Sequence, residues 1–180
     1  MAELYGVKIT NLKPFIGMEG LTCQGNVRLN GKTLGFWSQD PCGGLYDDYS
    51  FDTALLKEPV QRHFDAQPED WEFRDIYTNE DGSMTNDYVD VFMYDLCNLT
   101  LDEKDWKKQR KKGYPIMVHF HEAPPKEAPN ATPVIKTIHV GSSYLFKEDD
   151  DIKYLLRDEC GVKEPVLDKV YRRESDFIIK

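Results

Sequence analysis

An Asn-Gly pair at positions 30 and 31 constrains the fold of this chain more than any other feature. The pair separates two segments of strand-forming residues, 22–29 and 32–38. Both central residues of a two-residue hairpin turn adopt positive φ angles, which Asn and Gly reach at low energetic cost. The sequence therefore predicts an antiparallel hairpin that turns at Asn30 and Gly31.

The segment before this hairpin alternates in polarity as a strand does. Tyr5, Val7 and Ile9 fall on one side, and Lys8 and Thr10 fall on the other. Residues 4–38 therefore predict a three-stranded antiparallel sheet, which a run of turn-forming residues then ends.

A helical pattern follows over residues 52–64. Leu56, Val60 and Phe64 lie four residues apart, as the apolar stripe of a helix does. Pro59 interrupts this pattern, and it either kinks the helix or lies in the first turn of a new one, where no backbone N–H is needed.

Two further helical segments are expected in the middle of the chain. Residues 86–97 would also suit a strand, but the spacing of their apolar residues favours a helix. A capping box from Thr100 to Glu103 predicts a separate helix, which Gly113 ends.

The remaining patterns add strands and one more helix. We expect strands at residues 72–77, 116–121 and 134–140 and in the tail at 166–179, with a helix that begins at 149–151. This order predicts an α+β fold, an antiparallel N-terminal hairpin sheet followed by mixed helices and strands. The 180 residues suit a single domain, and if the chain divides into two lobes, we expect the boundary near Gln67-Pro68.

The charge of the chain is concentrated in its middle. The formal net charge is -9, and residues 40–95 hold fifteen acids against three bases. This excess argues against binding of a phosphate backbone by that segment and suits docking on a basic surface. A solvated acidic face is the simpler alternative.

Acids alternate with aromatic and aliphatic residues over 69–81, a combination that can provide both electrostatic steering and buried anchor contacts. The predicted partner-binding residues are Glu69, Asp70, Trp71, Glu72, Asp75, Glu80 and Asp81.

A basic run follows at the end of the expected helix after Thr100. Next to Trp106 and Tyr114, it could contact nucleic acid, although positive charge also suits the C-terminal end of any helix. The run consists of Lys107, Lys108, Arg110, Lys111 and Lys112.

Two histidines on one predicted strand offer the best candidate for chemistry. His119 and His121 point to the same face, and His139 on a nearby strand could join them as metal ligands. An ordinary solvated strand face is the alternative. No recognised catalytic motif or cofactor fingerprint accompanies them, so we predict no enzymatic activity, no metal site and no cofactor.

Two segments carry a resemblance to known proteins. LYGVKITNLKPFIGMEGLTCQGNVRLNGKTLGFWSQD, followed by Gly43-Gly44, and KKGYPIMVHFH resemble small proteins of phages and mobile elements in Gram-positive gut bacteria. That group is similar to one that includes type II anti-CRISPR proteins. The resemblance implies a non-enzymatic inhibitor that binds the RNA-guided CRISPR nuclease, with or without its guide RNA, and blocks target DNA binding or cleavage.

The sequence also indicates a compartment. It begins without the basic and apolar regions of a secretory signal peptide, and no apolar run is long enough to span a membrane. Four widely spaced cysteines favour reduced thiols, one or two of them buried. We therefore expect a protein of the bacterial host cytoplasm.

We thus predict an acidic, protein-binding nuclease inhibitor encoded by a phage or mobile element. One alternative is a generic acidic interaction module for another basic or nucleic-acid-associated partner. The other is a metal-dependent hydrolase that uses His119, His121 and clustered carboxylates.

Overall fold

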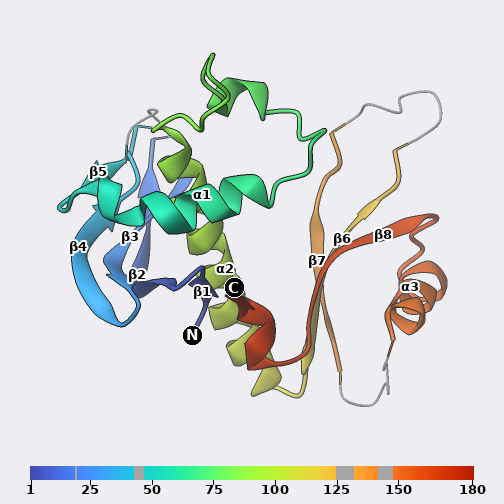
Figure 1. Ribbon diagram of the computed structural model, residues 1–180. Coiled ribbons are helices and arrows are strands. Elements are labelled where there is room, and N and C mark those ends of the chain that lie inside the picture. The colour runs from blue at the N-terminus through green and yellow to red at the C-terminus, as the bar shows by residue number, and fades with distance from the viewer. Residues whose placement is uncertain (19, 43–46, 125–131, 142–147) are drawn as a thin grey trace. The chain divides into compact units, whose positions relative to one another are not determined.

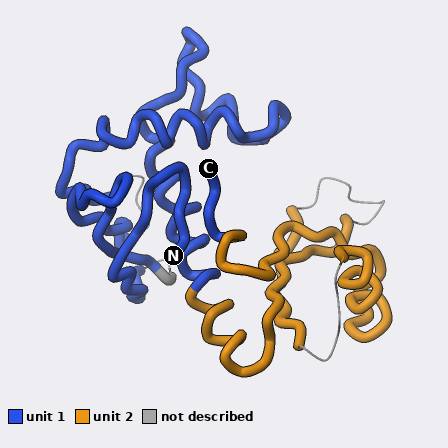
Figure 2. The backbone as a smooth tube through the Cα atoms, turned by 60° about the horizontal axis from the view of Figure 1, so that its bottom comes forward, with its two compact units in different colours: residues 1–103, 177–180 blue, residues 104–176 orange. Residues whose placement is uncertain are grey.

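The computed structural model describes residues 1–18, 20–42, 47–124, 132–141 and 148–180 (Figure 1). They form two compact units, residues 1–103 with 177–180 and residues 104–176 (Figure 2). The expected boundary near Gln67-Pro68 lies inside the first unit. The division falls instead between Glu103 and Lys104, within one long helix.

The first unit is built on a six-stranded sheet in the order β5-β4-β3-β2-β1-β9. Its pairs are antiparallel except for β1 and β9, which run parallel. Asn30 and Gly31 have φ angles of 48° and 84°, so the predicted hairpin turn is confirmed. The strands are β1 (Glu3–Leu4), β2 (Val7–Gly17), β3 (Gly20–Leu29), β4 (Lys32–Ser38), β5 (Asp48–Tyr49) and β9 (Ile178–Ile179).

A bulge interrupts β2 between Thr10 and Lys13. Asn11 adopts a positive φ of 54°, and Leu12 is buried. The bulge bends the strand and leaves polar side chains of β2 and β3 on the outer face of the sheet.

The helical pattern after the sheet divides in two. The 3-10 helix η1 (Thr53–Leu56) is followed by α1 (Lys57–Asp65), and Pro59 is the third residue of α1. Pro59 therefore lies in the first turn of a new helix, the second of the two expectations, and Leu56, Val60 and Phe64 are buried as predicted.

The predicted strand at residues 72–77 is wrong. Turns occupy its first part, and the 3-10 helix η2 (Asp75–Tyr77) its second. The rings of Trp71 and Tyr77 stack at 5.9 Å between centroids and both meet Tyr88, an arrangement that an extended chain cannot provide. Aromatic packing therefore overrides the strand propensity of this segment.

The segment at residues 86–97 is helical, as favoured, but it does not end before Thr100. Helix α2 runs from Tyr88 to Arg110. The predicted capping box is wrong, because Thr100 lies inside the helix and donates its hydroxyl to the carbonyl of Leu96 at 2.8 Å. The Glu103 carboxylate accepts the backbone N–H of Ala2 instead, at 2.7 Å.

Helices α1 and α2 cover the inner face of the first sheet (Figure 1). Apolar side chains from both helices and from β2, β3 and β4 form one core, which includes Val7, Ile9, Val27, Trp37, Val60, Phe64, Phe92, Met93 and Leu96. Burial of this apolar area is the main stabilising contribution to the first unit.

The second unit contains an antiparallel sheet in the order β7-β6-β8 and one helix on its face. Ile116, Val118 and Phe120 pack against Ile152 and Leu156. The elements are β6 (Ile116–Glu122), β7 (Lys136–Val140), α3 (Asp149–Asp158) and β8 (Pro165–Tyr171), followed by the 3-10 helix η3 (Glu174–Phe177).

These elements confirm the α+β class and most of the predicted C-terminal pattern. The tail returns to a sheet twice, since β8 pairs with β6 and β9 pairs with β1. Cys23 and Cys97 are buried, as expected for one or two of the cysteines. In the part of the chain that the structure describes, no helix is both long and apolar enough to cross a membrane.

Candidate partner-binding surface

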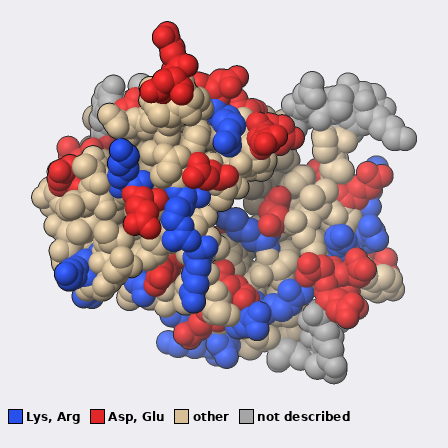
Figure 3. Space-filling model, in the orientation of Figure 1, with Lys and Arg blue, Asp and Glu red and all other residues tan. Residues whose placement is uncertain are grey.

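Residues 68–83 lie within the connection between α1 and α2 and are here called the acidic loop; they present their acids to solvent. All six acids predicted to bind a partner are exposed: Glu69, Asp70, Glu72, Asp75, Glu80 and Asp81. The tip of this loop is uppermost in Figure 1, and the space-filling view shows acidic side chains there (Figure 3). The structure thus places these acids on one loop of the first unit.

Trp71, the seventh predicted residue, takes a different position. Its ring stacks on Tyr77 and meets Phe73 and Tyr88 edge to face, with centroids 5.8–5.9 Å apart. Trp71 is half-buried and supports the loop from inside. The exposed apolar residues of the loop are Phe73 and Ile76, at 45% and 66% relative accessibility.

The loop acids are without ion-pair partners among the residues that the structure describes. Arg74, the one basic residue in the loop, places its guanidinium 4.9 Å from the centre of the Phe64 ring and donates to the carbonyl of Gln67. Among the described residues, no Lys or Arg forms an ion pair with any of the six exposed acids. Their negative charge therefore faces solvent without a local counter-charge.

Asp81 at the loop tip is held in its charged form. Its carboxylate accepts the Ser83 N–H at 2.9 Å and the Ser83 hydroxyl at 2.6 Å. These hydrogen bonds lower the pKa of Asp81 below its usual value, so the tip stays negative at neutral pH.

A hollow of about 400 Å³ lies beside the acidic loop, in the first unit. Three of its side chains come from one face of α2, at positions 90, 91 and 94, and Asp87 lies immediately before the helix. We call it the acidic hollow, and it is lined by Gln39, Asp47, Ile76, Tyr77, Asp87, Asp90, Val91 and Tyr94.

Burial perturbs two carboxylates of the acidic hollow. Asp90 accepts the Tyr49 hydroxyl at 2.6 Å, and Asp47 accepts the Trp37 indole N–H at 2.7 Å. Desolvation nevertheless raises the pKa of both groups, that of Asp90 to about 6. Neither residue was predicted to form a site; the i, i+3, i+4, i+7 spacing of Asp87, Asp90, Val91 and Tyr94 is a signal in the sequence for Asp90, whereas Asp47 has no such signal.

A buried histidine was also missed. His63 in α1 is 7% exposed, and its Nδ1 lies 2.8 Å from the Tyr88 hydroxyl. Its Nε2 lies 3.2 Å from a carboxylate oxygen of Asp95. Because Tyr88 is fully buried, this Tyr-His-Asp chain joins α1 to α2 and presents no hydroxyl to a substrate.

The histidines of β6 do not converge on one point. The imidazole Nδ1 of His121 lies 2.9 Å from Asp168, and that of His119 lies 3.1 Å from the Thr137 hydroxyl. His139 lies 2.8 Å from Asp105. Within the residues that can be described, no group of three or more His, Cys, Asp or Glu side chains could hold a metal ion.

The basic run lies at and beyond the end of α2, in the second unit. The guanidinium of Arg110 lies 4.9 Å from the centre of the Trp106 ring, and the Trp106 indole donates to the carbonyl of Pro115 at 2.8 Å. Lys108, Arg110, Lys111 and Lys112 are exposed, and Lys107 is half-buried. Four of the five predicted basic residues are therefore accessible, but Trp106 is fully buried and cannot stack on a base.

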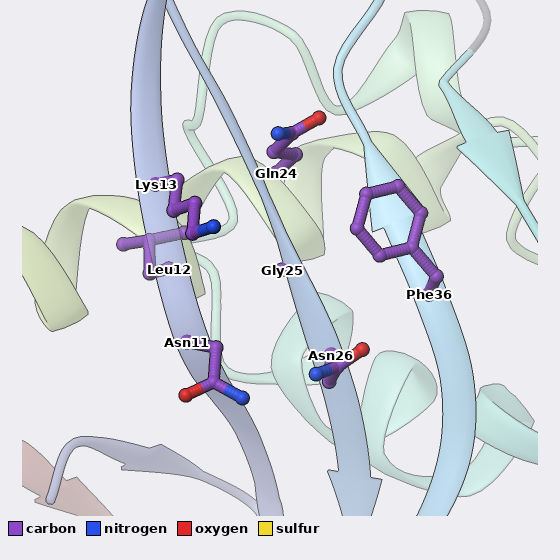
Figure 4. A pocket seen from close by; sticks show the side chains of 7 residues that line it. All are labelled: Asn11, Leu12, Lys13, Gln24, Gly25, Asn26 and Phe36. Atoms are coloured by element: carbon purple, nitrogen blue, oxygen red, sulfur yellow. The ribbon is translucent and has the colours of Figure 1, made fainter.

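A second hollow, of about 460 Å³, lies on the outer face of the first sheet beside the bulge (Figure 4). Its lining comes from three neighbouring strands and combines amide side chains with Lys13 and Phe36. The amides belong to Asn11, Gln24 and Asn26. The described residues that line this hollow include no acid, so it is chemically distinct from the acidic hollow.

Comparison of the chain with protein-family models, curated proteins and solved structures found no match.

Proposed function

We propose that the protein acts by binding and not by chemistry of its own, and that its acidic loop docks on a basic surface of a protein partner. The observation that carries this proposal is the set of exposed acids on the loop without ion-pair partners among the described residues. Charges arranged in this way accelerate association with a basic surface and disfavour acidic partners.

Our specific proposal for the partner is a type II RNA-guided CRISPR nuclease. The sequence resemblance points to this nuclease, and its DNA channel is positively charged. An acidic loop that occupied part of the channel would compete with the phosphate backbone and block target binding or cleavage. Such an inhibitor, encoded by a phage or mobile element, would act in the cytoplasm of the bacterial host.

The exposed basic residues at the end of α2 suit a second contact within the same complex. Lys108, Lys111 and Lys112 could bind phosphates of the guide RNA. RNase treatment of the complex would weaken it if this contact contributes.

A DNA cleavage assay tests the proposal directly. Purified protein should suppress cleavage by a type II nuclease at near-stoichiometric ratios. Full cleavage at about tenfold excess, over several type II nucleases, would contradict it. Binding to a basic partner without inhibition would favour a generic acidic interaction module instead.

Paired charge reversals test the role of the acidic loop. The double variant Glu69→Lys/Glu72→Lys should weaken binding and inhibition by roughly tenfold, because it replaces attraction by repulsion. The matched control Glu164→Lys/Glu174→Lys makes the same change in net charge at exposed residues of the second unit. Equal losses for the two variants would show that only net charge matters.

A further inference from the structure

The walls of the acidic hollow are mainly apolar, although acids surround it. Ile76 and Tyr94 line it and are 66% and 54% exposed, so their apolar surface is accessible in the folded unit. Val91 and Tyr77 complete the apolar part of the lining. This accessible apolar area forms part of a cavity and so offers a contact surface.

The acids of the hollow form no ion pair with a basic residue in the described parts of the chain. Within the described part of the chain, no Lys or Arg forms an ion pair with Asp47, Asp87 or Asp90. The donors to these carboxylates are neutral: Asp47 accepts the Trp37 indole N–H and the Asp40 backbone N–H, and Asp90 accepts the Tyr49 hydroxyl. A cation in the hollow would therefore meet carboxylates that have no ion-pair partner among the described residues.

We propose that the acidic hollow binds an arginine side chain of a protein partner. Arginine combines an aliphatic stem with a planar cation that can stack on an aromatic ring and donate two parallel hydrogen bonds to a carboxylate. The stem matches Ile76 and Val91, the guanidinium plane matches the Tyr94 ring, and its N–H groups match Asp90 and Asp87.

Other side chains fit this lining less well. A purely apolar side chain would bury the carboxylates without a partner, which is unfavourable. Lysine would supply the charge but not the flat face or the bidentate geometry. The raised pKa of Asp90 supports the assignment, because an incoming cation would relieve the unfavourable burial of its charge.

This inference rests on the proposed function only in taking the partner to be a protein with a basic surface. It adds the feature that the partner must present, an arginine next to apolar residues. The acidic loop would guide the encounter, and the hollow beside it would hold the anchor residue.

The inference is tested with a short capped peptide, Gly-Arg-Leu-Gly, and with the same peptide carrying citrulline in place of arginine. Citrulline keeps the shape and removes the charge. NMR titration of the full-length protein should show saturable shifts of the Ile76 and Val91 methyl groups with the arginine peptide. The citrulline peptide should bind at least about tenfold more weakly, a difference typical of a charge-assisted contact.

Single substitutions locate the binding site. Asp90→Asn and Tyr94→Ala should each weaken binding of the arginine peptide about three- to tenfold, whereas Glu164→Gln at an exposed position of the second unit should leave it unchanged. The Tyr94 side chain is more than half exposed, so Tyr94→Ala should leave the fold intact. Tyr94→Ala therefore tests the hollow even if Asp90→Asn perturbs the fold. Equal binding of the two peptides, or an equal loss with Glu164→Gln, would overturn the inference.

The outcomes separate the inference from the proposed function. Peptide binding without nuclease inhibition would retain the hollow and reject the nuclease as partner. Nuclease inhibition that is unchanged in both Asp90→Asn and Tyr94→Ala would retain the proposed function and reject the arginine site.

Discussion

At the scale of single residues, the polar groups buried between elements have the clearest physical roles. Tyr88 and His63 join α2 to α1 through a hydrogen bond that is inaccessible to water. Burial raises the pKa of the Tyr88 hydroxyl, so it stays protonated at all physiological pH values. A lost partner in such a pair leaves a buried polar atom unsatisfied.

Tyr88→Phe should therefore lower the free energy of unfolding by about 1–2 kcal/mol, because His63 Nδ1 loses its partner. Chemical denaturation followed by tryptophan fluorescence measures the change. Tyr94→Phe is the matched control on the same helix, and its exposed ring should keep the loss within about 0.5 kcal/mol. Equal losses for the two variants would contradict the role given to the buried bond.

The Asp90 carboxylate should make stability depend on pH. Its pKa is raised in the folded protein, from 3.8 to about 6, so the native state binds the proton more tightly than the unfolded chain. The ionised group is therefore destabilising above about pH 6, and this effect fades as the pH falls from 6 towards 4.

Asp90→Asn should accordingly raise the free energy of unfolding at pH 7.5 by about 1 kcal/mol, a value reduced for solvent screening of this half-buried group. The gain should be much smaller at pH 4.5, where wild-type Asp90 is largely protonated. Denaturation of both proteins at the two pH values measures the difference. A loss of stability at both pH values would show that the Tyr49 hydrogen bond to the carboxylate outweighs the desolvation.

At the scale of elements, β2 and β3 approach each other closely at the bulge of β2. This close approach limits the size of the residue that β3 can carry there. Gly25 lies on β3 opposite the bulge of β2, and a Cβ atom there would lie 2.5 Å from the Ile9 side chain and 3.1 Å from the Thr10 carbonyl. The bulge and the glycine therefore depend on each other.

Gly25→Ala should lower the free energy of unfolding by about 1–3 kcal/mol through overpacking. The neighbouring Asn26→Ala on the outer face of the same strand should cost less, because its side chain lies outside the core. Thermal or chemical denaturation compares the two variants. A stabilising effect of Gly25→Ala, as expected for a glycine in open space, would contradict the contact.

Two local sequence patterns predicted secondary structure that the folded protein does not have. The Thr100–Glu103 motif has the residues of a capping box, yet buried side chains on both sides of it, Leu96 and Trp106 among them, keep the helix continuous. The strand propensity of residues 72–77 fails because the rings of Trp71 and Tyr77 stack across a turn. In both segments, side-chain packing in the folded protein determined the backbone conformation.

At the scale of the whole molecule, charge is the property most relevant to binding. The net charge of -9 favours encounter with basic partners, and the acidic loop concentrates part of it on the first unit. Exposed charges are screened over about 8–10 Å at physiological salt, so their contribution falls as salt is added.

The association rate with a basic partner should therefore fall at least about tenfold between 50 and 500 mM salt, and the dissociation rate should change less. Stopped-flow or surface-based kinetics measures both rates. Glu69→Lys/Glu72→Lys should reduce the salt dependence, whereas the control Glu164→Lys/Glu174→Lys should reduce it less. A salt-independent association rate would remove electrostatic steering from the proposed mechanism.

Much of the fold was accessible from local signals in the sequence. Asn30-Gly31 determined the hairpin because few residues tolerate positive φ, and the alternation of Val7 and Ile9 determined which face of β2 is buried. The exposure of the loop acids also follows from their chemistry, since an unpaired charge is rarely buried.

Only the tertiary structure decided which residues meet across the chain. It turned Trp71 inwards onto Tyr77 and Tyr88, separated the three histidines among different partners, and formed the acidic hollow from Asp47, the acidic loop and α2. Local propensity acts over a few neighbouring residues, whereas these contacts join segments many residues apart. Their formation depends on packing and burial in the folded unit, which no local pattern records.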